Sequence, residues 1–321
     1  MPFWNRSSPG DPQRLIQAQQ EAEASQRSLE SGGLPTQAIR RLQEETAAGH
    51  PLFSSDLSTN EFLLTRNVGY IPLSQVMGSS IYQTGWQYTR SYASYSNLYE
   101  LTALSNAHQH AAQLALGRLE QEATILKAHG VIGVRLTIRE YEWGANMMEY
   151  TAIGTAIRLQ NVSPPAHPFL SDLSGQEFWT LLQAGYYPVG LVTGYCSYAV
   201  SSGWDLNQRL RSWYNQEIGE YTQAVYDARG LAMSRAESMA RKLKAVGIVG
   251  VHIGYTKQMY EYESEPTHTS YRDLYVHFSV VGTAITAQRK DHVIPSPKPT
   301  LTFTDLRPGS RGETRELTIK G

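Results

Sequence analysis

Cysteine is almost absent from this 321-residue chain, which contains only Cys196. One cysteine cannot form an internal disulfide or supply a cysteine-rich zinc site. We therefore expect a reducing compartment, and the cytoplasm in particular. Because no CxxC partner or neighbouring histidine accompanies Cys196, a small residue packed at a turn is favoured over a reactive thiol or a soft metal ligand.

Long apolar runs and an excess of charge are missing as well. No window approaches the roughly 20 uninterrupted apolar residues of a membrane-spanning helix, and the first residues contain no apolar stretch of signal-peptide length. The 28 basic and 29 acidic side chains leave a formal net charge of −1. Since no overall field attracts nucleic acid or an anionic membrane, we expect neither partner.

The local motifs of common enzyme classes are also missing. We find no GxSxG, no HExxH, no P-loop and no GxGxxG that opens a helix. Cys196 could pair with a distant histidine such as His252, but any protein of this size offers such combinations. The sequence predicts a protein that is not an enzyme.

An internal duplication organises the chain, whose length already suggests two cores. The stretch that begins at His50 returns at His167. Two further blocks recur in the same order: residues 126–136 return at 243–253, and residues 152–157 return at 280–285. We predict one repeat at residues 50–160, a linker at 161–166 and a second repeat at 167–288.

Each repeat shows the same succession of local patterns. Ser58 with Glu61, and Ser174 with Glu177, match a capping box at the start of a short helix. A first strand follows, which we predict to end at Gly78 and at Gly194 in the two copies. A long helix with one apolar stripe and two strands complete the repeat. The predicted fold class is α+β: two tandem β-α-β-β modules, each a small sheet covered by one long helix, with a helical N-terminal arm.

The two ends of the chain differ from the repeats. Residues 1–49 are polar with two helical patterns and read as an arm. Residues 289–321 form a proline-rich polar tail that we expect to be mostly without regular structure. Either end could bind a partner protein.

Three short blocks of the second repeat resemble a known family. They are Leu191-Val192-Thr193-Gly194, Ala245 to Val251, and Val281 to Ile285. At these residues the chain resembles the YbjQ-like family of bacterial, heavy-metal-binding domains, present as a tandem pair. The resemblance implies a dodecin-like module that assembles into pentameric rings through its sheets. A tandem chain would then build a ring of ten modules or two stacked five-fold layers. No fixed metal-ligand signature of the family can be carried over to this sequence.

Self-association is also expected on physical grounds. A three-stranded sheet covered by one helix keeps a bare face and bare edges unless it associates. We therefore predict a homo-oligomer, a pentamer or a multiple of five. Aromatic area favours interfaces over ligand surfaces here, and the predicted interface residues are Trp86, Tyr88, Tyr92, Tyr95, Tyr198 and Trp204.

Two groups of side chains are candidates for a divalent metal, although no cofactor is predicted outright. Glu261, Glu263, Glu265 and His268 alternate on a predicted strand or hairpin, so the three carboxylates could share a face for a hard cation. A solvated acidic loop is the favoured alternative. His108 and His110 form the densest histidine cluster, but residues two apart on a helix point about 200° apart.

A basic stretch is the candidate for nucleic acid, and it ranks below a solvated helix face. Its residues are Arg209, Arg211, Trp213, Arg235, Arg241, Lys242 and Lys244, balanced by Glu217, Glu220 and Glu237. Two functional hypotheses remain. The leading one is a non-enzymatic, homo-oligomeric ring or shell scaffold. The alternative is a metal-ion or small-cofactor binding protein that uses pockets between subunits.

Overall fold

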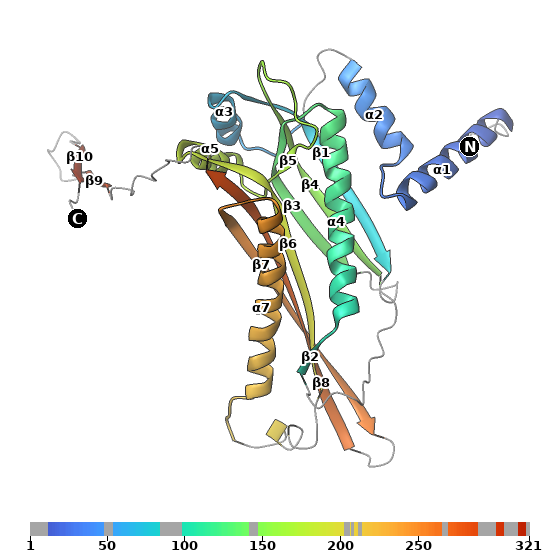
Figure 1. Cartoon of the computed structure of the whole chain (residues 1–321), viewed down its shortest axis with the longest axis vertical. Helices are drawn as coiled ribbons and strands as arrows, with labels where there is room; N and C mark the ends of the chain where they lie inside the picture. The colour runs from blue at the N-terminus through green and yellow to red at the C-terminus, as the bar shows by residue number, and fades with distance from the viewer. Residues whose placement is uncertain are drawn as a thin grey trace, which may run out of the picture.

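The structure is a computed structural model of the whole chain, and Figure 1 shows its two larger, four-stranded sheets, each with one long helix. It describes residues 12–47, 54–83, 98–140, 147–201, 206, 209–210, 214–264, 269–287, 300–304 and 314–318. The arm and the first module come first in the chain. Their elements are α1 (Pro12–Glu30), α2 (Thr36–Ala47), α3 (Thr59–Asn67), β1 (Tyr70–Gln83), β2 (Leu98–Glu100), α4 (Thr102–Ile125), β3 (Gly130–Glu140) and β4 (Met147–Leu159).

The second module repeats this order of a short helix, a strand, a long helix and two strands. The predicted α+β class with two modules and a helical arm is therefore confirmed. The tail contains two short paired strands that the sequence did not predict. The remaining elements are β5 (Phe169–Leu170), α5 (Gly175–Gln183), β6 (Tyr186–Val200), α7 (Gly219–Lys242), β7 (Gly247–Ser264), β8 (Thr269–Ala287), β9 (Thr300–Thr304) and β10 (Thr314–Thr318).

Both short helices begin at the capping boxes that the sequence indicates. The hydroxyl of Ser58 accepts from the N–H of Glu61, and the Glu61 carboxylate accepts from the N–H of Ser58. Ser174 and Glu177 repeat this exchange in the second module. These reciprocal bonds satisfy N–H groups that have no partner within the helix.

The predicted ends of the first strands are wrong. Gly78 and Gly194 lie inside β1 and β6, and both strands continue for several residues beyond them. A Cβ at Gly78 would lie 2.0 Å from the carbonyl oxygen of Ala115, and a Cβ at Gly194 would lie 2.0 Å from that of Ala232. These glycines let the long helix approach the strand, and they do not mark a turn. Cys196 consequently packs within a strand, not at a turn.

The two sheets exchange strands. The sheet of module one has the order β1-β4-β3-β5, and β5 belongs to the beginning of the second repeat. The sheet of module two has the order β2-β6-β8-β7, and β2 lies in the first repeat. Each module therefore lends a short strand to the other. In the described part of the chain, no strand pairs with the outer edge of β1 or of β7.

Both modules carry the same irregularity in the strand after the long helix. The register shifts between Ile132 and Arg135 in β3, and between Val249 and His252 in β7. Gly133 and Gly250 lie at these bulges with φ of +65°, a left-handed value that favours glycine. In module one, β5 pairs with β3 just before this bulge.

Strand β6 is buried on both faces because the two modules pack against each other. Val192, Cys196 and Val200 belong to the core that α7 covers. Leu191 and Tyr195 alternate with them and join cores built from module one. Helix α4 therefore packs on its own sheet and also covers the second sheet on the side opposite α7.

Candidate self-association surfaces

The contact between modules begins at the edge of β6, where α4 starts. The N–H of Leu101 donates to the carbonyl of Ser197 at 2.8 Å, and the N–H of Ser197 donates to the hydroxyl of Ser105 at 2.9 Å. One helical turn further along, the amide of Gln109 donates to the hydroxyl of Thr193 at 2.8 Å. Strand β2 continues this edge, since Glu100 pairs with Tyr198. The edge of the second sheet is thus closed by the first repeat.

Arg235 of α7 links the same edge to β2. Its guanidinium donates to the carbonyl of Tyr195 at 2.5 Å and to the carboxylate of Glu100 at 2.6 Å. Both charged side chains are mostly buried, so the pair is desolvated and depends on good geometry. It joins a helix of module two to a strand lent by module one.

On the other side of the module contact, β5 and the residues after it close the edge of β3. The N–H of Ser171 donates to the carbonyl of Val131, and the N–H of Val134 donates to the carbonyl of Ser171, both at 2.9 Å. The N–H of Gly133 at the bulge donates to the carbonyl of Leu173 at 2.8 Å. The start of the second repeat therefore completes the first sheet.

Two histidines meet within the module contact. His108 of α4 forms a hydrogen bond with the hydroxyl of Tyr150 and stacks on Tyr195 with ring centroids 6.1 Å apart. His277 of β8 lies 6.1 Å from His108 and bonds the hydroxyl of Ser197 at 2.9 Å. Burial lowers the pKa of His108 to about 4, with a smaller contribution from His277, and burial also lowers the pKa of His277. Both imidazoles are therefore neutral near pH 7.

The same positions are buried in one module and exposed in the other. Thr193 and Ser197 of β6 are 0% and 1% exposed, whereas their counterparts in β1, Met77 and Ile81, are 49% and 57% exposed. We call Met77 and Ile81, together with the edge of β1, the β1 surface. The difference arises because α4 and β2 cover β6, and the described residues contain no equivalent cover over these two side chains.

The opposite end of the module pair shows the reverse asymmetry. Val134 of β3 is 3% exposed because the second repeat covers it, whereas its counterpart Val251 of β7 is 38% exposed. Ile253 of β7 is 45% exposed. Tyr226 of α7, which is the counterpart of Gln109 of α4, is 65% exposed. We call Tyr226, Val251 and Ile253, with the edge of β7, the α7 surface. The module pair therefore has two different exposed surfaces, the β1 surface and the α7 surface. The residues equivalent to these surfaces in the other module contact each other within the chain.

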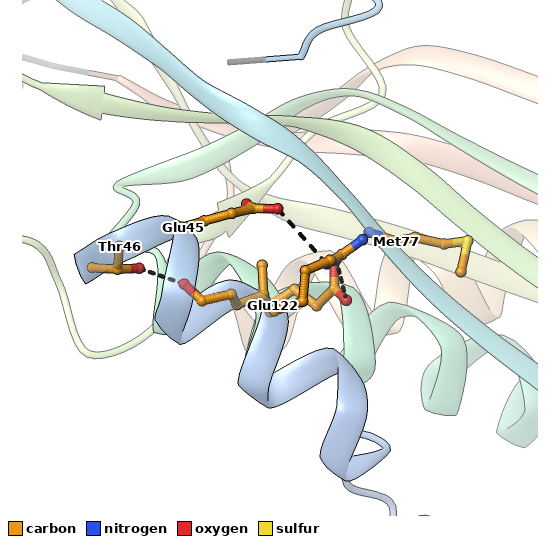
Figure 2. Close-up of polar contacts among 6 residues, drawn as sticks. Glu45, Thr46, Met77 and Glu122 are labelled. Carbon is orange, nitrogen blue, oxygen red and sulfur yellow. Dashed lines mark hydrogen bonds and ion pairs between the residues drawn. The ribbon is translucent and has the colours of Figure 1, made fainter. Parts of the chain in front are cut away.

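The arm packs on α4, beside the edge of β1. Leu42 of α2 is fully buried in the core of module one. Figure 2 shows Glu122 reaching from α4 to the backbone of Met77, with α2 alongside. The N–H of Met77 donates to this carboxylate at 2.9 Å, and Arg41 donates to it at 3.2 Å. Burial raises the pKa of Glu122, and these two donors act in the opposite direction.

The predicted metal ligands do not gather into one described cluster. Glu261 and Glu263 alternate along β7, and Glu261 forms an ion pair with Arg272 at 3.3 Å. Glu265 and His268 lie outside the described residues. His108 faces Tyr150, whereas the ring of His110 meets that of Tyr82 at 5.7 Å. Within the ranges that the structure describes, no group of three or more metal-ligating side chains is found.

Most of the predicted aromatic interface lies beyond the described ranges. Tyr198 is buried beneath α7, and its hydroxyl bonds Asp227 at 3.4 Å. Its backbone pairs with Glu100, so it contributes to the contact between modules through β2. The other five predicted residues lie outside the described residues: Trp86, Tyr88, Tyr92, Tyr95 and Trp204.

Three arginines of the basic stretch are paired with acidic side chains of the same chain. Arg209 bonds Glu220, Arg241 bonds Glu237 at 2.8 Å, and Arg235 binds Glu100 in a mostly buried pair. Arg211 and Trp213 lie outside the described residues. The engagement of these three guanidinium groups by carboxylates of the same chain weighs against a nucleic-acid site.

Two hollows lie on the described part of the surface. One, of about 340 Å³, is lined by Gln43, Thr46, Ala47 and Ile125 between α2 and α4. The other, of about 540 Å³, lies over the end of β4 and the linker, and its lining residues include Lys127 and Arg158. Neither lining contains His, Cys, Asp or Glu. Among the described helices, none is both long and apolar enough to cross a membrane.

The exposed residues of β1 were missed by the sequence analysis, although a signal for them exists. Aligned copies place Met77 opposite Thr193 and Ile81 opposite Ser197. Large apolar side chains in one copy thus replace small polar ones in the other, on alternate positions of a strand. Such a replacement on one strand face indicates that the two copies meet different neighbours there.

Comparison with known proteins agrees with this duplicated architecture. The YbjQ family model, described as "Putative heavy-metal-binding", matches residues 67–160 and 186–288. An encapsulin nanocompartment protein of Mycobacterium tuberculosis is 35% identical over 262 residues. This match covers 80% of the present chain and 93% of that relative.

Proposed function

The chain belongs to the YbjQ family, and from that premise we propose that it is a non-enzymatic structural subunit that assembles with copies of itself into a closed ring or shell. The relative named as an encapsulin nanocompartment protein supports a shell role. We further propose that the assembly is cytoplasmic, in keeping with its single buried cysteine.

The observation that carries the proposal is the asymmetry between the two ends of the module pair. Met77 and Ile81 are about half exposed where Thr193 and Ser197 are buried. Contact surfaces that differ and fit head to tail generate rings when the rotation closes. A second copy whose α7 surface meets the β1 surface would repeat the contact that already joins modules one and two.

The number of chains depends on the rotation at which this repeated contact closes. Each copy would add two modules, so five chains would give one ring of ten modules or two stacked five-fold layers. Five is the number that the family resemblance implies, and we propose it here. Any closed ring of this kind buries both surfaces of every chain, whereas an open array leaves one of each exposed.

Native mass spectrometry of the full chain tests the proposal. We expect a single closed oligomer with a mass that is a whole multiple of 35.9 kDa and no retained ligand. A monomer at micromolar concentration would contradict the proposal. A stoichiometric metal adduct, lost when Glu261 and Glu263 are both replaced by Gln, would favour the alternative of a metal-binding protein.

A further inference from the structure

Arg118 and Arg235 hold equivalent positions on the two long helices but have different partners. Each guanidinium donates to a carbonyl of the adjacent strand edge, Ser79 in one module and Tyr195 in the other. The remaining donors of Arg235 reach Glu100, which module one supplies. Those of Arg118 reach the carbonyls of Leu29 and Gly33, which the arm supplies, both at 3.1 Å.

The same exchange of partners occurs one turn further along each helix. Met239 of α7 is contacted at its sulfur by Gln109 of module one at 3.5 Å. Its counterpart on α4 is Glu122, which Arg41 of the arm contacts at 3.2 Å. At two successive positions of the long helix, therefore, the arm contacts module one. Module one contacts module two at the equivalent positions.

We propose that the edge of β1, together with the adjoining part of α4, is the docking surface for module two of a second copy of the chain, and that the arm occupies the α4 part of this surface until the second copy displaces the arm. The inference rests on the proposed self-assembly and names the surfaces that meet. The arm thus acts as a cap. In a free chain the arm covers the docking surface, and in the ring module two of the neighbouring chain covers it instead.

The incoming copy has the groups that this exchange requires. Residues 215–217 form an exposed segment before α7, at the place that β2 occupies before α4. Glu217 is the counterpart of Glu100 and would bring a carboxylate to Arg118. Hydrogen bonds between a guanidinium and a carboxylate are stronger than those to neutral carbonyls. Arg118 therefore gains a better partner when Glu217 replaces Leu29 and Gly33.

Apolar burial compensates for the loss of the arm. Leu42 must leave the core of module one if α2 moves away. Tyr226, which is 65% exposed, is the counterpart of Gln109 and would lie over Met77 and Glu122. Covering Tyr226, Met77 and Ile81 removes three large apolar surfaces from water, against the two buried apolar residues of the arm, Leu34 and Leu42.

Cross-linking between engineered cysteines tests the docking geometry. In the full chain, Met77→Cys with Tyr226→Cys should react with a short bis-maleimide linker to give a ladder of covalent multimers. The matched pair Tyr226→Cys with Met259→Cys uses an equally exposed position on β7 and should give no ladder. Cys196 is buried in every variant and adds the same low background. If the first pair gives no ladder while native mass spectrometry still shows an oligomer, the docking surface is wrong and the proposed function stands.

Charge reversal on the arm tests the displacement. Arg41→Glu removes the bond to Glu122 and places two carboxylates together, so the arm should leave more readily. We expect the ladder of the Met77→Cys/Tyr226→Cys chain to form at least fivefold faster. Arg40→Glu is the control, because Arg40 pairs with Glu21 within the arm and not with module one. Equal rates for Arg41→Glu and the parent would overturn the capping role of the arm.

Hydrogen exchange on the unaltered chain gives an independent reading if a variant fails to fold. The amides of α2 should exchange faster in the assembled protein than in the diluted monomer, because the second copy displaces the helix. Equal or slower exchange of α2 in the assembly would overturn the inference.

Discussion

At Gly78 and Gly194 a long helix lies so close to a strand that no side chain fits between them. A Cβ at Gly194 would lie 2.0 Å from the carbonyl oxygen of Ala232, which is backbone and cannot rotate away. Alanine at this position would force the helix off the sheet. We predict that Gly194→Ala lowers the free energy of unfolding by about 3 kcal/mol or more, the upper end of what overpacking costs.

Gly230 is a matched control within the same module. It lies in α7, and a Cβ there would meet nothing within 4 Å. Gly230→Ala should therefore raise the free energy of unfolding by about 0.5–1 kcal/mol, because alanine favours a helix more than glycine does. Chemical denaturation of both variants decides the point. Equal effects of the two substitutions would mean that the helix is not in close contact with the strand.

The local residue signals were predictable, and the tertiary ones were not. Ser58 with Glu61 lie three positions apart on one helix turn, so the capping box can be read from the sequence. The role of Gly78 depends on Ala115, a residue far along the chain. A glycine after the strand-like run Leu73–Met77 therefore suggested the end of a strand, although the strand continues.

At the scale of elements, α4 differs from α7 because it packs on two sheets at once. His108 points from α4 into the contact with module two, beside His277. Their lowered pKa values mean that the folded state favours neutral imidazoles. Their contribution to stability is complete above the unfolded pKa of about 6.5 and is lost as the pH falls toward about 4.

We predict that the melting temperature falls as the pH is lowered from 6.5 to 4, and that His108→Gln with His277→Gln flattens this dependence. Neutral side chains at both positions leave no proton to take up, so the slope should shrink even if the variant is less stable overall. The control is His167→Gln, which alters an exposed histidine. Thermal melts over this pH range decide the matter, and an unchanged slope in the double variant would show that the buried pair does not control it.

The long helices and strands could be predicted, but the strands that the modules lend each other could not. Eleven or more residues of periodic sequence identify α4 and α7. Strands β2 and β5 contain three and two residues, too few for any period. They exist because a neighbouring sheet offers an open edge, and that edge is a property of the fold.

At the scale of the whole molecule, each repeat covers part of the other. The sequence led us to expect a bare face on each module. Among the described residues, the β1 surface and the α7 surface are instead the places where the cover found in the other module has no counterpart. Which repeat covers which depends on how the linker places them, and composition carries no information on that.

Ile81 is the position at which a single charge should separate folding from assembly. It is 57% exposed in one chain and would be buried by a second copy. We predict that Ile81→Glu weakens association at least tenfold and changes the melting temperature of the monomer little. Val162→Glu is the control, since Val162 is 50% exposed in the linker. Light scattering coupled to size-exclusion chromatography over a dilution series measures both, and equal effects of the two substitutions would remove Ile81 from the interface.

Electron cryomicroscopy of the assembled protein at side-chain resolution tests the account most directly. The account predicts that the rotation and translation relating module one to module two within a chain also relate module two to module one of the next chain. Met77 of one copy should then lie beside Tyr226 of its neighbour. A two-fold contact in which module one faces module one of another copy would contradict it.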